Sequence, residues 1–296
     1  MQQYLELVDK ILTDGRPKSD RTGKGTLSIS GYEIRHEIRH EIRHDHKDGF
    51  PLLTTKKMHS RSIMVELEGF INGITDKKWY QDRGCHIWDE WCNPQIVPYG
   101  HDDKTKERMK NERDLGAFYG FQWRHFGAEY KGYDADYEGK GVDQLANMIN
   151  TLKDNPCDRA MIVTALNPPF FNQMALRPCH YCFQVISDGK TIDLIWNQRS
   201  VDTMLGLPFN IASYAKLQHL LARETGQKVG ELIGHLGDVH IYNHHIDNAR
   251  MQVKRIPKTL PTIEFEDYGS IFDWKHNDVK INDYQHHPSI KFDIAV

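Results

Sequence analysis

The chain has 296 residues, a formal net charge of −3 at pH 7 and 39% hydrophobic residues. This length suits one large domain with a sizeable core, and the charge argues against a nucleic-acid coat protein or a polybasic membrane binder. The cysteines are sparse and odd in number, and we find no apolar run long enough to span a bilayer. We therefore expect a reduced, cytoplasmic protein.

The first predicted elements are an amphipathic helix ending at Gly15, a glycine-rich loop at 20–26 and a strand at 27–34. The tetrapeptide Glu-Ile-Arg-His then occurs in tandem at 33–36, 37–40 and 41–44. Its period keeps the isoleucines together on a strand and nearly together on a helix, so both conformations stay open. We favour a duplication tolerated in an exposed hairpin or loop over a histidine-rich surface for a metal or partner.

The middle of the chain alternates apolar periodic segments with one polar stretch. Residues 60–72 have helical spacing with Gly73 beyond the end, and 86–91 are aromatic and expected to pack. Residues 93–114 are polar and charged, which predicts a surface insertion within a single domain spanning 1–296.

The second half of the chain mixes predicted helices and strands. Helices are expected at 142–152 and 211–224, and strands at 161–165, 182–186, 191–196, 262–265 and 291–294. Because these elements show no regular βαβ alternation, we predict the α+β class rather than a doubly wound sheet.

Cys179 is the first candidate for chemistry. A free cysteine is more often a buried hydrophobe, but adjacent His180 and a cation such as Arg199 would favour the reactive thiolate. A zinc site using Cys182 is a weak alternative because no second close-spaced pair exists, and we expect no metal. On a regular strand the spacing of these two thiols would also point them to opposite faces.

Arginines and one amide suggest the ligand. The guanidinium forks of Arg21, Arg159 and Arg199, with the hydroxyl of Ser200, suit a phosphate monoester. Asn210 lies in an apolar run, and its carboxamide matches the ring N–H and neighbouring carbonyl of uracil. A helix N-cap is an equally good interpretation of Asn210 alone.

Several longer motifs accompany these residues. They are Asp-Arg-Thr-Gly at 20–23, Phe-Pro-Leu-Leu-Thr-Thr-Lys-Lys at 50–57, Ile-Trp-Asp-Glu-Trp at 87–91, Tyr-Gly-Phe-Gln-Trp-Arg at 119–124, Pro-Cys-His at 178–180, Gln-Arg-Ser at 198–200, the run 206–214, Gly-Asp-Val-His-Ile-Tyr at 237–242 and Ala-Val at 295–296. With these motifs in this order, the chain resembles the thymidylate synthase family nearly end to end.

The resemblance implies a fold and a reaction. The fold would be a three-layer, thymidylate-synthase-like α+β domain whose large mixed sheet packs at a homodimer interface. The reaction would be reductive methylation of dUMP to dTMP, with 5,10-methylenetetrahydrofolate donating the carbon and the hydride. No metal, membrane or nucleic acid would be needed. Cys179 would add to carbon 6 of uracil, making carbon 5 the nucleophile.

The resemblance also implies site residues. Glu66 would order water for proton transfers and Tyr119 would assist removal of the carbon 5 proton, completing a catalytic set with Cys179, His180, Arg199 and Asn210. The nucleotide would be bound by Arg21, Gln198, Arg199, Ser200, Asp202, Asn210, His240 and Tyr242, and by Arg159 from the other subunit. The folate would be bound by Lys56, His59, Trp88, Trp91, Asp202, Gly206, Ala295 and Val296.

Four departures from the family pattern stand out. Ala160 replaces a usual arginine, Leu166 a usual tryptophan and Arg177 a usual proline, while Glu68-Gly69 stands for the usual Leu-Trp. The last change removes a large aromatic side chain near the folate site and adds a carboxylate.

Two alternatives therefore remain beside thymidylate synthase. In a related dUMP hydroxymethylase, water captures the exocyclic methylene and gives 5-hydroxymethyl-dUMP and tetrahydrofolate. The Glu68-Gly69 change favours this branch, whereas Trp88, Trp91 and the Ala-Val tail favour methylation. The remote alternative is an inactive nucleotide- or RNA-binding homologue, against which an intact Cys179 and the negative net charge both argue.

Overall fold

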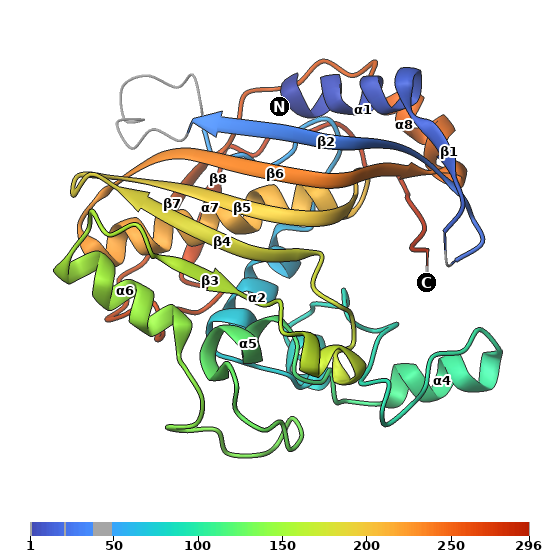
Figure 1. Ribbon diagram of the computed structural model, residues 1–296. Coiled ribbons are helices and arrows are strands. Elements are labelled where there is room, and N and C mark those ends of the chain that lie inside the picture. Colours follow the sequence, from blue (N-terminus) through green and yellow to red (C-terminus); the bar gives the residue numbers. More distant parts are fainter. Residues whose placement is uncertain (1, 21, 38–48, 296) are drawn as a thin grey trace.

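The protein, seen in a computed structural model that describes residues 2–20, 22–37 and 49–295, is built on a six-stranded mixed sheet (Figure 1). The strands lie in the order β1 (Arg16–Lys18), β2 (Thr26–Glu37), β6 (Lys228–Tyr242), β5 (Thr191–Asp202), β4 (His180–Ser187) and β3 (Ile162–Thr164). Neighbours in this sheet pair antiparallel except β5 and β6, which are parallel. The predicted α+β class with a large mixed sheet is confirmed.

Helices and a separate hairpin surround the sheet. The α-helices are α1 (Gln2–Asp14), α2 (Ser60–Ile71), α3 (Lys77–Gln81), α4 (Asp103–Asn111), α5 (Tyr119–His125), α6 (Gln144–Asp154), α7 (Gly206–Thr225) and α8 (Ile246–Gln252). Short 3-10 turns occur at η1 (Pro168–Gln173) and η2 (Asn243–His245), and β7 (Thr262–Phe265) pairs with β8 (Val279–Asn282). In the view of Figure 1, α1 and α8 lie above the sheet and α2 and α5 below it.

α7 is the central helix of the core and packs against β5 and β6. Its residues Leu217, Leu220 and Leu221 have no exposed surface, as a helix that is apolar around most of its circumference requires. It ends at Gly226, whose φ of 69° is the left-handed conformation that glycine adopts most easily. The predicted helix at 211–224 is confirmed, but α7 begins earlier than expected.

The first helix ends where Gly15 was expected to stop it. The Gly15 N–H donates to the Ile11 carbonyl at 2.9 Å. A Cβ at position 15 would lie 2.3 Å from that same oxygen, so only glycine fits this close return of the chain. The helices predicted at 60–72 and 142–152 are also confirmed, as α2 and α6.

Two strands were misjudged. The sequence pattern did not reveal β6, because glycines interrupt its alternation. One of them, Gly234, lies against Trp196, and a Cβ there would be 2.2 Å from the indole ring. The strand predicted at 291–294 is wrong, since these residues form no strand and β7 pairs instead with β8.

The first copy of the tandem tetrapeptide is a strand. Residues 33–36 belong to β2, where Glu33 pairs in register with His235 of β6. The His235 Nε2 lies 3.5 Å from the Glu33 carboxylate. Residues 38–48, with most of the other two copies, lie outside the described residues.

The polar stretch at 93–114 carries α4, which projects at the periphery of the molecule (Figure 1). A buried lysine, Lys77, ties this stretch to the body. Its Nζ donates to the carbonyls of Met109 at 2.7 Å, Lys110 at 3.3 Å and Asp89 at 3.2 Å. An ammonium at the last carbonyls of a helix satisfies them and complements the helix dipole, so α4 is anchored at its C-terminal end.

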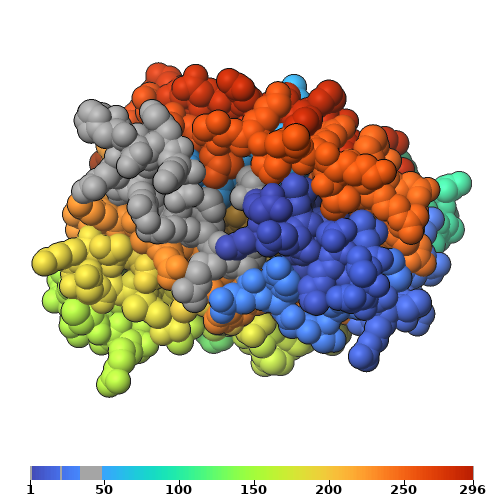
Figure 2. All heavy atoms as spheres, turned by 90° about the horizontal axis from the view of Figure 1, so that it is seen from above, coloured from blue at the N-terminus to red at the C-terminus, as the bar shows by residue number. Residues whose placement is uncertain are grey.

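The N-terminal helix lies against the last third of the chain, as Figure 2 shows from above in blue and orange. The Tyr4 hydroxyl donates to the Thr203 carbonyl at 3.0 Å, just before α7 begins. Within the described residues, no helix combines the length and the apolar character that crossing a bilayer demands.

Candidate active site

Cys179 and Arg199 are brought together by the pairing of β4 and β5. The Arg199 N–H donates to the Cys179 carbonyl at 2.8 Å. The guanidinium donates through Nε to the Pro178 carbonyl at 2.9 Å and through Nη2 to the Arg177 carbonyl at 2.8 Å. This holds Nη2 3.9 Å from the Cys179 sulfur, where a fixed cation favours the thiolate.

A β-bulge shapes this end of β4. The register between β4 and β5 shifts between His180 and Cys182. Asn197 Nδ2 lies 3.4 Å from the Cys182 sulfur, while Arg199, two residues further along β5, reaches Cys179. Cys179 precedes β4 and the register shifts before Cys182, so the regular strand on which the expectation of opposite faces depended is not present here. Among the residues described, no group of His, Cys, Asp or Glu is arranged to hold a metal ion.

Tyr119 contacts Cys179, and His180 connects Tyr119 with Tyr214. The Cys179 N–H donates to the Tyr119 hydroxyl at 2.8 Å. The His180 ring stacks on Tyr119 at 4.3 Å, and its Nδ1 lies 2.9 Å from the Tyr214 hydroxyl. Burial lowers the pKa of His180 to about 3, so this imidazole is neutral at physiological pH. His180 thus positions two tyrosines, and Arg199 is the cation beside the thiol.

Tyr214 ends the motif at 206–214 but was not among the predicted site residues. It follows Asn210 by one turn of α7, so the two side chains share a helix face. That spacing is the signal that could have identified it.

Glu66 is a buried carboxyl on α2 with an unusual pKa. The Trp88 indole N–H donates to its Oε1 at 3.0 Å. Burial raises the pKa of Glu66 to about 7, although the bond from Trp88 opposes the rise. A carboxyl with this pKa can both accept and give a proton at neutral pH.

Asn210 lies inside α7 rather than at its cap. Leu205 occupies the N-cap position, so the N-cap interpretation of Asn210 is wrong. Gln198 on β5 donates through Nε2 to the Asn210 Oδ1 at 3.0 Å, and its own Oε1 accepts from Trp196 at 3.1 Å. This relay fixes which end of the buried Asn210 amide is the acceptor.

His240, Tyr242 and Asp202 lie near the ends of the parallel strands β5 and β6. His240 and Asp202 are register partners, and the His240 ring meets Tyr242 edge-on at 5.2 Å. The Asp202 Oδ1 accepts from the Met204 N–H at 2.8 Å, close to the start of α7 at Gly206. The strand ends therefore bring three predicted site residues to the N-terminal end of α7.

Lys56 connects this region to the C-terminal tail. Its Nζ donates to the Met204 carbonyl and lies 4.6 Å from the ring centroid of Phe292. Burial lowers the pKa of Lys56 to about 8, while Asp202 raises it. Ala295 is half-buried a few residues beyond Phe292, and His59 is exposed just before α2.

Trp88 and Trp91 form an indole pair, with ring centroids 6.1 Å apart at 69°. The Trp91 Nε1 is buried and has no hydrogen-bond partner among the described residues. A buried indole N–H usually has an acceptor, so this atom fits a polar, planar heterocycle of the kind predicted for the site.

Of three further predicted residues, the structure describes one. Arg21 and Val296 are outside the described residues. Arg159 is exposed, and its carbonyl accepts from Gln184 at 3.3 Å. Since β4 runs from His180 past Gln184, Arg159 lies along the strand from Cys179 and is not brought to it within one chain.

The Glu68-Gly69 departure has a local explanation. The Glu68 carboxylate is buried and accepts from the His276 N–H at 2.8 Å, with the His276 Nδ1 at 2.7 Å. Gly69 faces the ring of Tyr80, which takes the space of the missing side chain. The carboxylate is thus bonded away from the predicted site residues, which removes the observation that favoured a hydroxymethylase.

A hollow of about 690 Å³ lies elsewhere, between α3, α5 and the loop before α6. Two of the carboxylates that line it are ion-paired: Asp143 with Arg124, which also lines the hollow, and Asp76 with Arg113, which does not. Of the described residues that line it, none belongs to the predicted site.

The whole chain is also similar to known proteins. A family model described as "Thymidylate synthase" matches residues 2–296. The bifunctional dihydrofolate reductase-thymidylate synthase of Leishmania major is 43% identical over 298 residues, covering 100% of this chain and 55% of that protein. The chain thus spans about half the length of the curated relative it matches.

Proposed function

Because the chain belongs to the thymidylate synthase family, we propose that it converts dUMP to dTMP by reductive methylation. The observation that carries the proposal is the Arg199 guanidinium, held by two backbone carbonyls beside the Cys179 sulfur. A cation fixed in this way favours a thiolate nucleophile and can also receive a phosphate.

The first step follows from the strand-borne residues. The Cys179 thiolate adds to carbon 6 of uracil, and the electron pair of the ring double bond moves toward the carbonyl at carbon 4. Asn210, oriented by Gln198, accepts from the ring N–H and donates to that carbonyl oxygen, where negative charge develops. Arg21, Arg199 and Ser200 hold the phosphate, and His240 and Tyr242 contact the sugar hydroxyl.

Later steps need proton transfers. Reduced folate supplies the one-carbon unit and the hydride, and leaves as dihydrofolate. Tyr119, held by the Cys179 N–H, assists loss of the carbon 5 proton, and Glu66 relays protons through water. The Cys179 sulfur is released when the carbon 5–carbon 6 double bond re-forms.

The folate site is proposed beside the indole pair. The buried N–H of Trp91 supports a planar polar ligand there, and Lys56 and Asp202 add polar contacts. His59 and Gly206 complete the set on the chain segments that lead into α2 and α7. The tail through Ala295 and Val296 closes over the ligand and excludes water.

A homodimer and a cytoplasmic location belong to the same proposal. Arg159 is exposed and far along β4 from Cys179, which supports its donation to the site of a second copy. Ile162 and Ile186 are 48% and 45% exposed on β3 and β4, as an uncovered interface surface would be. All five cysteines lie in the described chain and are free, which supports a reducing compartment.

The deciding experiment is to incubate the protein with dUMP and methylenetetrahydrofolate, weigh the nucleotide product and follow dihydrofolate by absorbance. We expect dTMP and dihydrofolate in equal amounts. A hydroxymethyl product without dihydrofolate would refute methylation, and no product with retained dUMP binding would indicate a binding protein.

A further inference from the structure

Gly69 on α2 and Tyr80 on α3 form a complementary pair. A Cβ at position 69 would lie 2.3 Å from both Cε1 and Oη of Tyr80, so the tyrosine ring occupies the space that a side chain there would need. Tyr80 has no exposed surface. The ring therefore belongs to the wall behind α2, the helix that carries Glu66.

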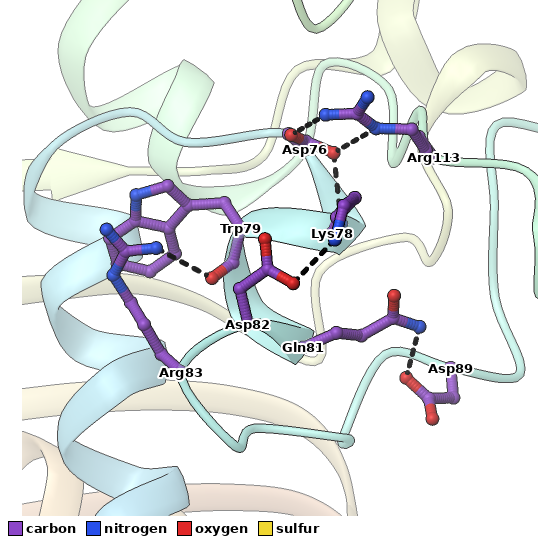
Figure 3. Close-up of polar contacts among 8 residues, drawn as sticks. All are labelled: Asp76, Lys78, Trp79, Gln81, Asp82, Arg83, Asp89 and Arg113. Atoms are coloured by element: carbon purple, nitrogen blue, oxygen red, sulfur yellow. Dashed lines mark hydrogen bonds and ion pairs between the residues drawn. The ribbon is translucent and has the colours of Figure 1, made fainter.

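The short helix α3 is fixed from its outer side, as Figure 3 shows. Its N-cap Asp76 accepts from the Lys78 N–H at 3.0 Å and also from Nε and Nη2 of Arg113. At the other end, Arg83 lies over Trp79 at 3.9 Å and donates to the Trp79 carbonyl at 3.1 Å. These contacts set the rotation of the helix and thereby direct Tyr80 inward.

Tyr80 is also bonded at both ends. Its hydroxyl donates to the Ile74 carbonyl at 2.9 Å, just past the end of α2. Its carbonyl accepts from the Cys85 N–H at 3.0 Å. Cys85 begins the segment that leads to Trp88, whose indole donates to Glu66. One residue thus connects α2 with the segment that bonds its carboxyl.

The groups that face Glu66 from other elements are uncharged at neutral pH. Tyr80 on α3, Tyr119 on α5 and Tyr214 on α7 all have raised pKa values because they are buried, and each interacts electrostatically with Glu66. Burial raises the pKa of Cys85 to about 12. Glu66 thus lies in a buried, neutral surrounding, with Tyr80 on one side.

We propose that Tyr80 is a positioning residue for Glu66: its ring fills the volume beside Gly69, excludes water from the α3 side of the buried carboxyl and holds the Trp88 segment in place. This rests on the proposed function, in which Glu66 relays protons. Tyr80 touches neither substrate, and its effect passes through Glu66 and Trp88.

The first test compares Tyr80→Leu with Tyr80→Phe. Leucine opens space and admits water, which favours the ionised carboxylate, so the acidic limb of the pH profile of kcat should move about one unit lower. We expect kcat to fall about tenfold at the optimum, less than the loss of about 10²–10⁴-fold expected on removing a general acid–base group itself, because Tyr80 acts through Glu66. Phenylalanine keeps the ring and should keep the wild-type limb. An unmoved limb in Tyr80→Leu would overturn the proposal.

The second test exchanges the two volumes. Gly69→Trp alone clashes with Tyr80 and should lower the melting temperature. Gly69→Trp combined with Tyr80→Leu returns an aromatic ring to the same space. We expect the double variant to recover both the melting temperature and the pH limb relative to Tyr80→Leu. A double variant no closer to wild type than Tyr80→Leu would contradict the complementary pair.

A titration separates this proposal from the proposed function. Proteins labelled with ¹³C at the glutamate carboxyl can be titrated by NMR, with Glu66→Gln assigning the signal. We expect the Glu66 resonance to titrate about one unit lower in Tyr80→Leu than in wild type. That shift would support the positioning role even if no dTMP were formed, and equal titration in both proteins would refute it even in an active enzyme.

Discussion

The part of the site on the strands and the part on the helices differ in their electrostatic environment: the first is exposed and charged, and the second is buried and neutral. On β4 and β5, Cys179 and the exposed Arg199 keep charge available, and backbone carbonyls fix the cation without neutralising it. On α2, Glu66 is buried among aromatic rings, and its pKa rises to about 7 because water is excluded. An exposed fixed cation suits an anionic substrate and nucleophile, whereas a buried carboxyl suits proton exchange.

The difference follows from the elements that carry each part. Strand pairing places neighbouring side chains within contact distance and leaves one sheet face open to a ligand. Helix packing closes a volume from several sides, as α2, α3, α5 and α7 do around Glu66. Four substitutions test whether the two parts act in these separate ways.

Cys179→Ala should have the largest effect and separates the thiol from the remaining strand site. We expect kcat to fall by at least about four orders of magnitude, the scale seen when a nucleophile is removed, with dUMP binding retained. Steady-state rates and calorimetry measure the two effects. Cys182→Ala removes the neighbouring thiol, three residues further along the chain, and is the matched control, which should stay within a few-fold of wild type. Retained turnover in Cys179→Ala would end the proposed mechanism.

Arg199→Lys tests the backbone clamp. A lysine keeps the charge but cannot make both carbonyl bonds, so the cation loses its fixed place beside the thiol. We expect kcat/KM for dUMP to fall about 100-fold, a loss of about 3 kcal/mol in transition-state stabilisation, and Cys179 to react more slowly with iodoacetamide. Arg177→Lys is the control, since only its carbonyl serves the clamp. An unchanged alkylation rate in Arg199→Lys would refute the electrostatic role.

Glu66→Gln tests the buried part through stability. The carboxyl keeps its proton up to about pH 7 in the folded protein, against an ordinary 4.5, so the folded state binds more protons between these values. The free energy of unfolding therefore decreases as pH rises through this window, by on the order of 3 kcal/mol. Glutamine does not titrate, so the variant lacks this contribution to the pH dependence of the free energy of unfolding. Denaturation at pH 5 and pH 8 should show the variant gaining on wild type at the higher pH, and a constant difference would contradict the raised pKa.

Trp88→Phe should give the smallest effect. The indole N–H stabilises the ionised Glu66, so its loss raises the carboxyl pKa further, and the acidic limb of the kcat profile should move up by about half a unit. Tyr80→Leu moves the same limb in the other direction. If the acidic limb moved in the same direction in Trp88→Phe and in Tyr80→Leu, packing, and not the named contacts, would control the pKa of Glu66.

Much of this could be predicted from residues close together in the chain. The periodicity of residues 211–224 identified the body of α7. Motifs around Cys179 and Asn210 led us to propose a nucleophile and a base-reading amide, and each of the two residues is hydrogen-bonded to β5. Local pattern failed where the cause is distant. Gly234 interrupts the alternation of β6 because Trp196 of another strand occupies its side-chain space.

The bulge and the Tyr80 wall escaped prediction for a similar reason. Alternation predicts a regular pleat, but the register shift after His180 is defined only against β5. From the sequence, Gly69 was interpreted as the loss of an aromatic side chain. The ring that fills its space belongs to Tyr80 on α3, a separate element. A missing side chain in one helix can be judged only with the neighbour that fills its volume.

The pairing of β2 with β6 affects how the newly synthesised chain folds. Thr26 lies opposite Tyr242 and Leu27 opposite Ile241, so most of the polypeptide must be synthesised before the second strand finds its long partner. Such non-local pairing slows folding and leaves an unpaired strand edge exposed meanwhile. During synthesis, β2, which includes the first copy of the tandem tetrapeptide, therefore has an unpaired edge until β6 is made. Chaperones would bind the nascent protein at this edge.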